Sequence, residues 1–495
     1  MDDTAEKKLE KKGVHWKNWP RTTEEERNKA EEYYLGEIMP LLIEVFVARE
    51  RLKVKKRYDG MVLSLGTSFE PLVLSIMALN PDKVCFLCTE ESRQYLDPVI
   101  HFTGLTPSKF EACMVDKDNP LQIYQAIKDI YKEWGRPANI VVDFTGGTKS
   151  MSGGSTMAGG LIGADMVYVA SSNYLVSLRR PFPGSEHLEF IPNPYQVFGD
   201  LEEEKALGLM AQHDYSGASR IFTDLEKQVP DPRRYAVLFL LCRAYEAWDN
   251  LDIAEARENM ALLVERVRQY ATLQKHFILA EKLPILEFQL EALKTMEKYI
   301  TGFRRDLKAR NSCRNSDVLV EVFNQQDFVL ALMFTLYCSA RRRGSQGKYD
   351  MASLLLYRIL ELISQVRLAA RGLDTVLPDY SVLDGKKLLS VLNSRYKKYK
   401  DAQPLNSLPQ HINMFQGYML LDAMGDELTQ KINLDQIRGQ VNSRNYNIFA
   451  HGFDFVNADA CGKILKLVEG VMERFLAIWG KKLAELEEKY HYINP

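Results

Sequence analysis

Strand-like and helix-like segments alternate through the first third of the chain, and the strand-like segments then stop. Between the first two apolar runs, residues 69–80 have helical spacing of their apolar side chains. Alternating strands and helices predict a parallel sheet covered by helices on both faces. No strand-like run follows Pro192, so the sequence predicts an α/β domain followed by all-helical parts. The four apolar runs typical of strands are residues 61–66, 83–92, 140–147 and 166–171.

This change of character divides the chain into four predicted parts. In the third part, Tyr215-x-x-Ala218 and Leu251-x-x-Ala254 are expected in equivalent turns 36 residues apart, close to the period of helical-hairpin repeats. Two copies are too few for a solenoid, so we predict a helical spacer. The parts are an N-terminal helical extension (1–55), the sheet domain (56–198), the spacer (199–320) and a second helical domain (321–495).

Composition and termini favour a cytoplasmic protein without a metal or cofactor. The first residues are charged, and the apolar run 39–48 contains Glu44 and is too short to cross a bilayer. Cys85 and Cys88 lie three apart in a predicted strand, on opposite faces, which favours buried structural thiols. The eight histidines are dispersed, with no cluster at metal-ligand spacing. The formal net charge of -2 means that any nucleic-acid site must come from local patches.

Polar clusters follow three of the predicted strands. Because the carboxyl ends of parallel strands share one edge of a sheet, we expect these clusters to form one rim where a ligand binds. The cluster in DFTGGTKSM lacks the phosphate-loop spacing G-x-x-x-x-G-K-[ST], so it is not placed to grip a β/γ-phosphate pair with Mg²⁺. A plain turn with glycines for packing is the alternative. The candidate ligand-binding residues are Gly66, Thr67, Ser68, Thr89, Glu90, Ser92, Thr145, Gly146, Gly147, Thr148, Lys149 and Met151.

The segment SRNYNIFAHG, residues 443–452, carries the candidate chemistry of the second helical domain. Arg444 and His451 are seven apart, so a continuous helix would place them on one stripe, together with Asn447. A cation for the scissile phosphate and an imidazole to move a proton are what metal-free RNA cleavage by the 2'-hydroxyl requires. A surface helix that happens to carry Arg and His is the alternative.

Two motifs in this order resemble one family. R-N-x5-H near the end of an all-helical domain resembles the HEPN ribonuclease motif, and DFTGGTKSM after a strand resembles the ligand loop of CARF domains. KYDMASLLLYRILELISQVRL also resembles the first helix pair of that family's HEPN domain. Apart from the spacer, the chain resembles the CARF and HEPN ancillary ribonucleases of type III CRISPR systems, which act in antiviral defence.

The resemblance implies an allosteric homodimer with a Rossmann-like CARF domain. Two CARF domains would share one cyclic oligoadenylate, whose two-fold symmetry suits a dimer axis. Gly146 and Gly147 would let backbone amides approach phosphate or ribose, Thr145 and Thr148 would add hydroxyl donors, and Lys149 would add charge. The activated enzyme would be an endoribonuclease that cuts single-stranded RNA without a metal.

The resemblance also implies catalytic roles in a site composed from both protomers. His451 would be the general acid or base, Arg444 would stabilise the charge on the phosphorane, and Asn445 would orient its neighbours. Arg358 and Glu361 either brace this site or form an internal salt bridge. The products would carry a 2',3'-cyclic phosphate.

Two basic segments and two other functions stay open. The segment 386–400, with six basic residues and two tyrosines, either guides RNA or forms a solvated helix face, and so does the triplet 341–343. The nucleotide sensor could instead serve a helical scaffold that signals to a partner, or a HEPN-like nucleotide transferase.

Overall fold

The computed structural model describes residues 4–309, 316–381, 383–399, 404–449 and 452–495. The chain divides into two compact units: unit 1 contains residues 1–201 and 228–230, and unit 2 contains residues 202–227 and 231–495. Among the helices of the described ranges, none combines the length and apolar character that a membrane span requires.

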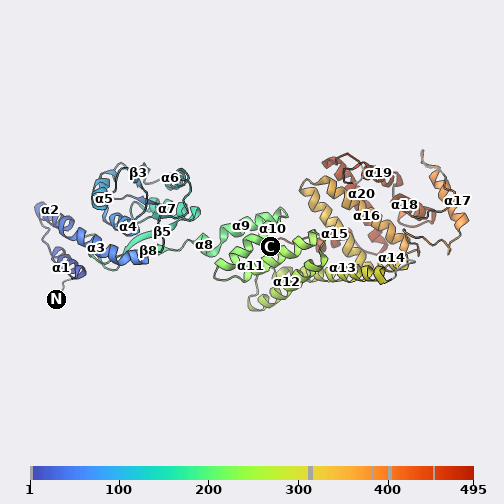
Figure 1. Cartoon of the computed structure of the whole chain (residues 1–495), viewed down its shortest axis with the longest axis horizontal. Helices are drawn as coiled ribbons and strands as arrows, with labels where there is room; N and C mark the ends of the chain where they lie inside the picture. The colour runs from blue at the N-terminus through green and yellow to red at the C-terminus, as the bar shows by residue number, and fades with distance from the viewer. Residues whose placement is uncertain (1–3, 310–315, 382, 400–403, 450–451) are drawn as a thin grey trace. The chain divides into compact units, whose positions relative to one another are not determined.

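Unit 1 is built around a six-stranded sheet of order β3-β2-β1-β4-β5-β8. Figure 1 labels three of these strands, β3, β5 and β8. The first five strands are parallel, and β8 pairs antiparallel with β5. The predicted α/β plus all-α fold with a Rossmann-like parallel sheet is confirmed. A short pair, β6 and β7, forms a separate ribbon. The strands are β1 Gly60–Ser64, β2 Val84–Cys88, β3 Phe110–Met114, β4 Ile140–Asp143, β5 Asp165–Ser171, β6 Tyr174–Leu175, β7 Arg180–Pro181 and β8 Glu186–Ile191.

Two strands of the sheet, β3 and β8, were not predicted from the sequence. Strand β3 lies at one edge, and its side chains are half-buried or exposed, so it has no continuous apolar run. Strand β8, EHLEFI, mixes charged and apolar residues and has only one face in the core. The four predicted strands, by contrast, include the fully buried β1, β2 and β4, whose apolar runs follow from burial on both faces.

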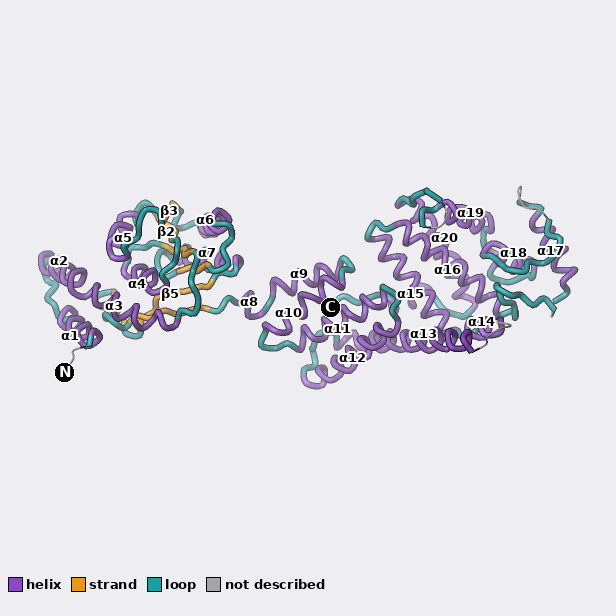
Figure 2. The backbone as a smooth tube through the Cα atoms, viewed as in Figure 1, coloured by secondary structure: helices purple, strands orange, loops and turns teal. Residues whose placement is uncertain are grey.

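Helices cover both faces of the sheet (Figure 2). Met61 and Leu63 of β1 join the core under α3, α4 and α5, whereas Val62 between them joins the core under α6 and α7. Cys85 and Cys88 likewise fall in opposite cores, as predicted. The helices of unit 1 are α1 Ala5–Lys17, α2 Glu24–Tyr33, α3 Met39–Glu50, α4 Glu70–Leu79, α5 Leu96–Thr103, α6 Pro120–Glu133, α7 Lys149–Ile162 and α8 Pro194–Phe198.

Helical hairpins make up the described part of unit 2. The turns before α10 and α12 each contain a residue of positive φ, His213 at 63° and Leu251 at 61°, followed by Asp214 or Asp252, whose carboxylate accepts an amide of the next helix. These equivalent positions are 38 residues apart, so the predicted match of Tyr215 with Leu251 is wrong by two residues. The helices are α9 Asp200–Ala211, α10 Tyr215–Gln228, α11 Arg233–Asp249, α12 Ile253–Leu273, α13 Leu283–Ala309, α14 Ser316–Phe323, α15 Gln326–Ser345, α16 Tyr349–Ala369, α17 Gly385–Tyr396, α18 Met414–Ala423, α19 Leu434–Tyr446, α20 Ala458–Ile478 and α21 Leu483–Tyr490.

Candidate functional site

The loops after β1 and β4 touch backbone to backbone at the carboxyl edge of the sheet. A Cβ atom placed on Gly66 would lie 2.6 Å from the amide nitrogen of Gly147, and one on Gly146 would collide with the carbonyl oxygen of Ser64. Gly147 has φ of 85°, a conformation that glycine adopts without strain. Two of the three predicted clusters therefore meet directly, and glycine is required where they meet.

Several predicted ligand-binding hydroxyls already have partners inside the protein. Thr145 donates to Asp143 and accepts from the amide of Val169 at 2.8 Å. Thr148 caps α7 and donates to the carbonyl oxygen of Lys117 at 2.7 Å. These threonines join the loop after β4 to its neighbours on both sides, and this holds the rim in place.

Hydrogen bonds within the protein also fix the loop after β2. Ser92 is buried and its hydroxyl accepts from the amide of Thr89 at 2.9 Å. Met151 is also buried and packs against Gly147 from below. The predicted residues of the rim that remain exposed are Thr67, Ser68, Glu90, Gly147 and Lys149.

The charged side chains of the rim include the buried acid Asp143, the exposed acid Glu90 and the exposed cation Lys149. Asp143 is fully buried beneath the loop, and burial raises the pKa of its carboxyl, while bonds from Thr145 oppose that rise. Lys149 is exposed at the first turn of the 14-residue helix α7, whose free amides favour an anion. The positive charge that could meet an anionic ligand is therefore concentrated at Lys149 and the first turn of α7.

Sequence reasoning missed the contribution of the loop after β3. Lys117 follows that strand, accepts the bond from Thr148 through its carbonyl oxygen, and pairs with Glu91 at 2.8 Å. Because β3 itself has no apolar run, nothing in the sequence placed Lys117 at this edge.

The second candidate site lies where α19 ends. Helix α19 stops at Tyr446, and Asn447 instead forms a bridge with Asp454. The side chain of Asn447 accepts from the amide of Phe449 at 2.8 Å, a local bond that competes with helix continuation. Asn447 therefore does not continue the helix of Arg444, so the prediction of one helical stripe is wrong for Asn447. His451, the third residue of that predicted stripe, lies outside the described residues.

An acid at the start of α16 holds this loop. The Nδ2 atom of Asn447 donates to Oδ1 of Asp350 at 2.7 Å, and the amide of Val456 donates to the same oxygen at 2.9 Å. Asn447 is only 3% exposed. Asp350 was missed because an acid in a first helical turn is ordinarily explained by the helix dipole.

Of the other predicted residues of this site, only Arg358 and Glu361 have side chains that the structure describes. His451 and the side chains of Arg444 and Asn445 lie outside what the structure describes. Arg358 donates to Glu361 at 3.0 Å and to Gln365 at 2.8 Å, along one face of α16. No described hydrogen bond joins these three side chains to Asn447.

Four aromatic side chains near the end of α19 are exposed. In the described ranges Tyr446, Phe449, Phe453 and Phe455 are each more than half exposed, and Phe453 is 85% exposed. Exposed apolar clusters of this kind mark interaction surfaces. We name these four residues the aromatic cluster.

The two basic segments differ, because the arginines 341–343 form ion pairs within the protein whereas most described basic residues of 386–400 are exposed. Arg342 is buried and bonds to Asp249 at 2.9 Å, so it is neither an RNA contact nor a solvated side chain. In α17, Tyr396 is buried and Arg395 pairs with Asp422, which leaves Lys386, Lys387, Lys397 and Lys398 exposed. In the described part of the chain, no group of three or more His, Cys, Asp or Glu side chains is placed to hold a metal ion.

Comparison with known proteins relates both units to one kind of protein. A family model described as the Csm6 6H domain matches residues 198–293, and one described as the Csm6 HEPN domain matches residues 321–475. The CRISPR system endoribonuclease Csm6 of Thermus thermophilus is 27% identical over 455 residues, covering 89% of this chain and 90% of that protein. A solved structure of Enterococcus italicus Csm6 bound to cyclic hexa-2'-fluoro-hexa-dAMP covers 87% of this chain and 97% of its own, with 13% identity and a TM-score of 0.44.

Proposed function

The chain belongs to the CARF and HEPN ancillary ribonucleases, and from this premise we propose that it is a metal-independent endoribonuclease of single-stranded RNA, activated by a cyclic oligoadenylate. The observation that carries the proposal is the position of residues 444–451. Residues 444–446 form the end of α19 and Asn447 follows it, inside the segment that matches the Csm6 HEPN domain, and Asp350 anchors Asn447. A relative of similar length is an endoribonuclease.

The chemistry follows from two side chains, Arg444 and His451. The 2'-oxygen attacks phosphorus as its proton moves to a base, and the bond to the 5'-oxygen breaks as that oxygen takes up a proton. His451 serves one of these transfers, and Arg444 stabilises the charge that develops on phosphate. The products are a 2',3'-cyclic phosphate and a 5'-hydroxyl. Asn445 orients Arg444 and His451. The exposed aromatic cluster favours a second copy of the chain as the partner that covers it.

The rim of unit 1 is the proposed activator site. The touching glycine loops allow a ring to lie flat on the backbone, and Lys149 and the first turn of α7 supply positive potential for its phosphates. Thr67, Ser68 and Glu90 are exposed to contact ribose or base. A ring with two-fold symmetry would contact the same residues in both chains of a homodimer. We retain the division 1–55, 56–198, 199–320 and 321–495 as the functional parts.

Cleavage of labelled single-stranded RNA tests the nuclease. His451→Ala should lower the rate of RNA cleavage by about 10²-fold or more, the usual contribution of a general acid or base. Arg444→Ala should lower the rate as far. His411→Ala is the matched control, since His411 is an exposed histidine of the same unit that bonds to the carbonyl oxygen of Val376. EDTA should leave the rate unchanged, and 2'-deoxyribose at the cut site should block it. Wild-type rates for His451→Ala, or loss of activity in EDTA that Mg²⁺ restores, would exclude this mechanism.

Ring titration tests the activator site separately. Lys149→Ala should weaken ring binding by about 1–3 kcal/mol, the scale of a charge-assisted contact. Lys83→Ala is the control, because Lys83 is exposed next to the amino end of β2, at the other edge of the sheet. RNA cleavage should rise when the right ring is added, since the ring must favour the active arrangement. Equal affinity for wild type and Lys149→Ala would remove the rim from the proposal.

A further inference from the structure

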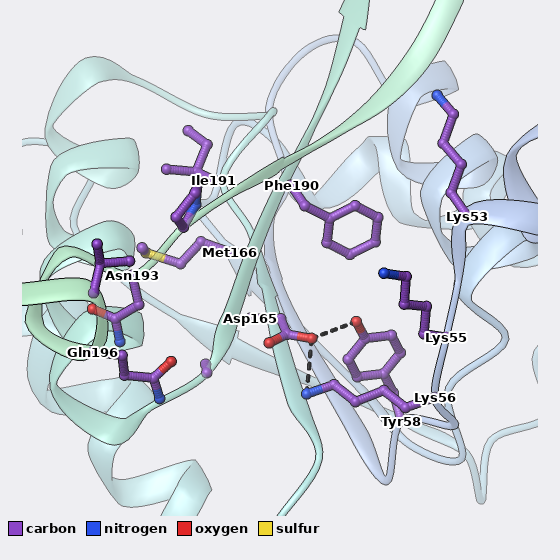
Figure 3. Close-up of a pocket in the computed structure, with 13 residues that line it drawn as sticks. Lys53, Lys55, Lys56, Tyr58, Asp165, Met166, Phe190, Ile191, Asn193 and Gln196 are labelled. Carbon is purple, nitrogen blue, oxygen red and sulfur yellow. Dashed lines mark hydrogen bonds and ion pairs between the residues drawn. The ribbon is translucent and has the colours of Figure 1, made fainter. Parts of the chain in front are cut away.

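A cavity in unit 1 lies apart from the rim, at the amino ends of β1 and β5 (Figure 3). Its walls include residues 53–58, the start of β5 at Asp165 and the end of β8 with α8. The rim follows the carboxyl ends of β1 and β4, whereas this cavity adjoins the amino ends of β1 and β5, and the two share no residue. Its volume, about 580 Å³, lies in the range of small-molecule sites.

One wall of the cavity is positively charged. Lys53, Lys55 and Lys56 come from the connection between α3 and β1. Lys56 pairs with Asp165 at 2.9 Å, and Tyr58 donates to the same carboxylate oxygen at 2.6 Å, so that this acid is already neutralised. No described ion pair engages Lys55, whose ammonium group points toward the ring of Phe190 in Figure 3. The lining side chains thus leave a surplus of positive charge.

The facing wall is apolar. Met166 is buried, and the half-buried ring of Phe190 lies between it and the lysines (Figure 3). Ile191 and Val197 extend the apolar surface. A flat aromatic ring in an open cavity is a platform for another planar ring, and base-on-aromatic stacking of this kind tolerates any base.

The amides that line the cavity differ in their availability. Asn193 is committed, because its Oδ1 accepts from the amide of Tyr195 and its Nδ2 donates to the carbonyl oxygen of Gly160 at 2.8 Å. Gln196 is exposed and makes only a long 3.5 Å contact, with the carbonyl oxygen of Gly163. One amide is therefore free to bond to the edge of a ligand.

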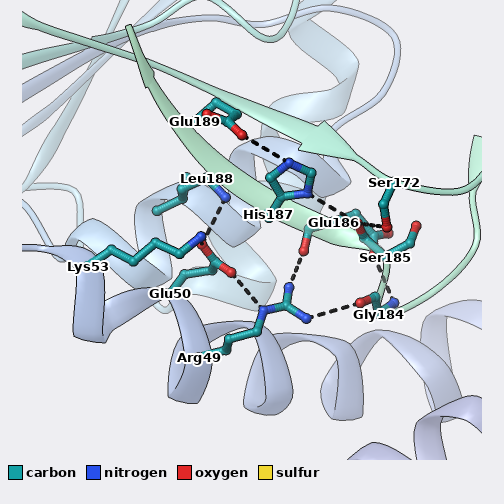
Figure 4. Close-up of polar contacts among 10 residues, drawn as sticks. All are labelled: Arg49, Glu50, Lys53, Ser172, Gly184, Ser185, Glu186, His187, Leu188 and Glu189. Carbon is teal, nitrogen blue, oxygen red and sulfur yellow. Dashed lines mark hydrogen bonds and ion pairs between the residues drawn. The ribbon is translucent and has the colours of Figure 1, made fainter. Parts of the chain in front are cut away.

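From this combination we infer that the cavity binds a nucleoside monophosphate. The base stacks on Phe190 beside Met166, Gln196 bonds to the edge of the base, and Lys55 receives the phosphate. A bare inorganic anion would leave the apolar wall in water, and a neutral nucleoside would leave Lys55 without a counter-charge. Lys53 pairs with the buried Glu50 at 2.7 Å, so its charge is already matched and Lys55 is the cation left for the phosphate (Figure 4). This inference does not depend on the proposed function.

Equilibrium dialysis of the full-length protein with AMP, UMP, adenosine and inorganic phosphate tests the site. AMP and UMP should both bind saturably at or below about 1 mM, and adenosine and phosphate should each bind at least about tenfold more weakly. Lys55→Ala and Phe190→Leu should each weaken AMP binding by about tenfold or more, the leucine being chosen because Phe190 also packs against the core.

Lys83→Ala serves as the control that should bind AMP as the wild type does. A loss of AMP binding in Lys149→Ala would assign the nucleotide to the rim and overturn the inference. Absence of saturable binding at about 1 mM would overturn it as well. So would unchanged affinity in Lys55→Ala or Phe190→Leu, or phosphate binding as tight as AMP binding.

Discussion

The side-chain amide of Asn447 donates to the carboxylate of Asp350 at 2.7 Å, across 97 residues of sequence. The same carboxylate oxygen accepts the amide of Val456, so one acid holds both ends of the loop that carries the proposed catalytic histidine. Between these ends, Gly452 lies so close to Tyr446 that a Cβ atom would collide with its backbone. The geometry of this loop is therefore set from outside its own helix.

Replacing Asp350 tests this anchoring role. Asp350→Ala leaves the buried Asn447 amide without its partner, and misplacement of the loop by about 1 Å can cost about 10²-fold in rate. Asp350→Asn keeps an acceptor oxygen and should recover most of the activity. RNA cleavage and ring binding should be measured together, because only cleavage is expected to fall. If Asp350→Ala cleaves at the wild-type rate, the loop does not need this anchor.

Glycine substitution tests the contact between the loops after β1 and β4. Gly146→Ala would push a methyl group into the carbonyl oxygen of Ser64, so the variant should melt at a lower temperature and bind the ring at least about tenfold more weakly. Gly153→Ala in α7 is the control, because nothing lies within 4 Å of its added Cβ and alanine favours the helix by up to about 1 kcal/mol. Comparable melting temperatures for the two variants would contradict the backbone contact.

Glu186 makes the stability of unit 1 depend on pH. Burial raises the pKa of its carboxyl from 4.5 to about 7, although Arg49 lies nearby and the Gly184 amide donates to it at 2.8 Å (Figure 4). A raised folded-state pKa stabilises the fold fully below pH 4.5, and this contribution is lost as pH rises to about 7. Stability should therefore fall across that window.

Thermal unfolding of Glu186→Gln measures this effect. The substitution removes the titrating group, so the fall in melting temperature between pH 4.5 and 7 should shrink, and the variant should melt a few degrees higher than wild type at pH 8. Glu189→Gln, on the exposed side of the same strand, should keep the wild-type slope. An unchanged slope in Glu186→Gln would show that other groups cause it.

The carboxyl-terminal tail should stabilise unit 2 through the ring of Tyr492. That ring stacks on Tyr245 with centroids 4.0 Å apart, and the guanidinium of Arg342 lies 3.8 Å from its centre. The hydroxyl of Tyr492 is buried without a hydrogen-bond partner in the described structure. Tyr492→Phe should therefore be neutral or stabilising, whereas Tyr492→Ala should cost about 3–5 kcal/mol in chemical denaturation.

Removal of the last two residues provides the control for the tail. Asn494 and Pro495 are exposed, so their deletion should leave the denaturation midpoint unchanged. A Tyr492→Phe variant that is as unstable as Tyr492→Ala would mean that the hydroxyl, rather than the ring, makes the important contact.

Buried strands and the rim could be read from the sequence because their signals are local. A strand covered on both faces must be apolar along its length, as β1, β2 and β4 are, and parallel strands place their following loops at one edge. Strands β3 and β8 each have a face or an edge in water, so their side chains carry no such run. Lys117 was not predicted at the rim because β3, the strand that precedes it, was not predicted.

Tertiary contacts decided the features that depend on distant partners. The Rossmann-like sheet followed by helices could be predicted from the sequence. The end of α19 at Tyr446 could not, because the residues after it keep the spacing of a helix. Asp350 and Arg342 look like ordinary charged helix residues until their partners Asn447 and Asp249 are brought against them. Local periodicity specifies which face of an element is buried, whereas the identity of a polar partner 97 positions away depends on the packing of whole helices.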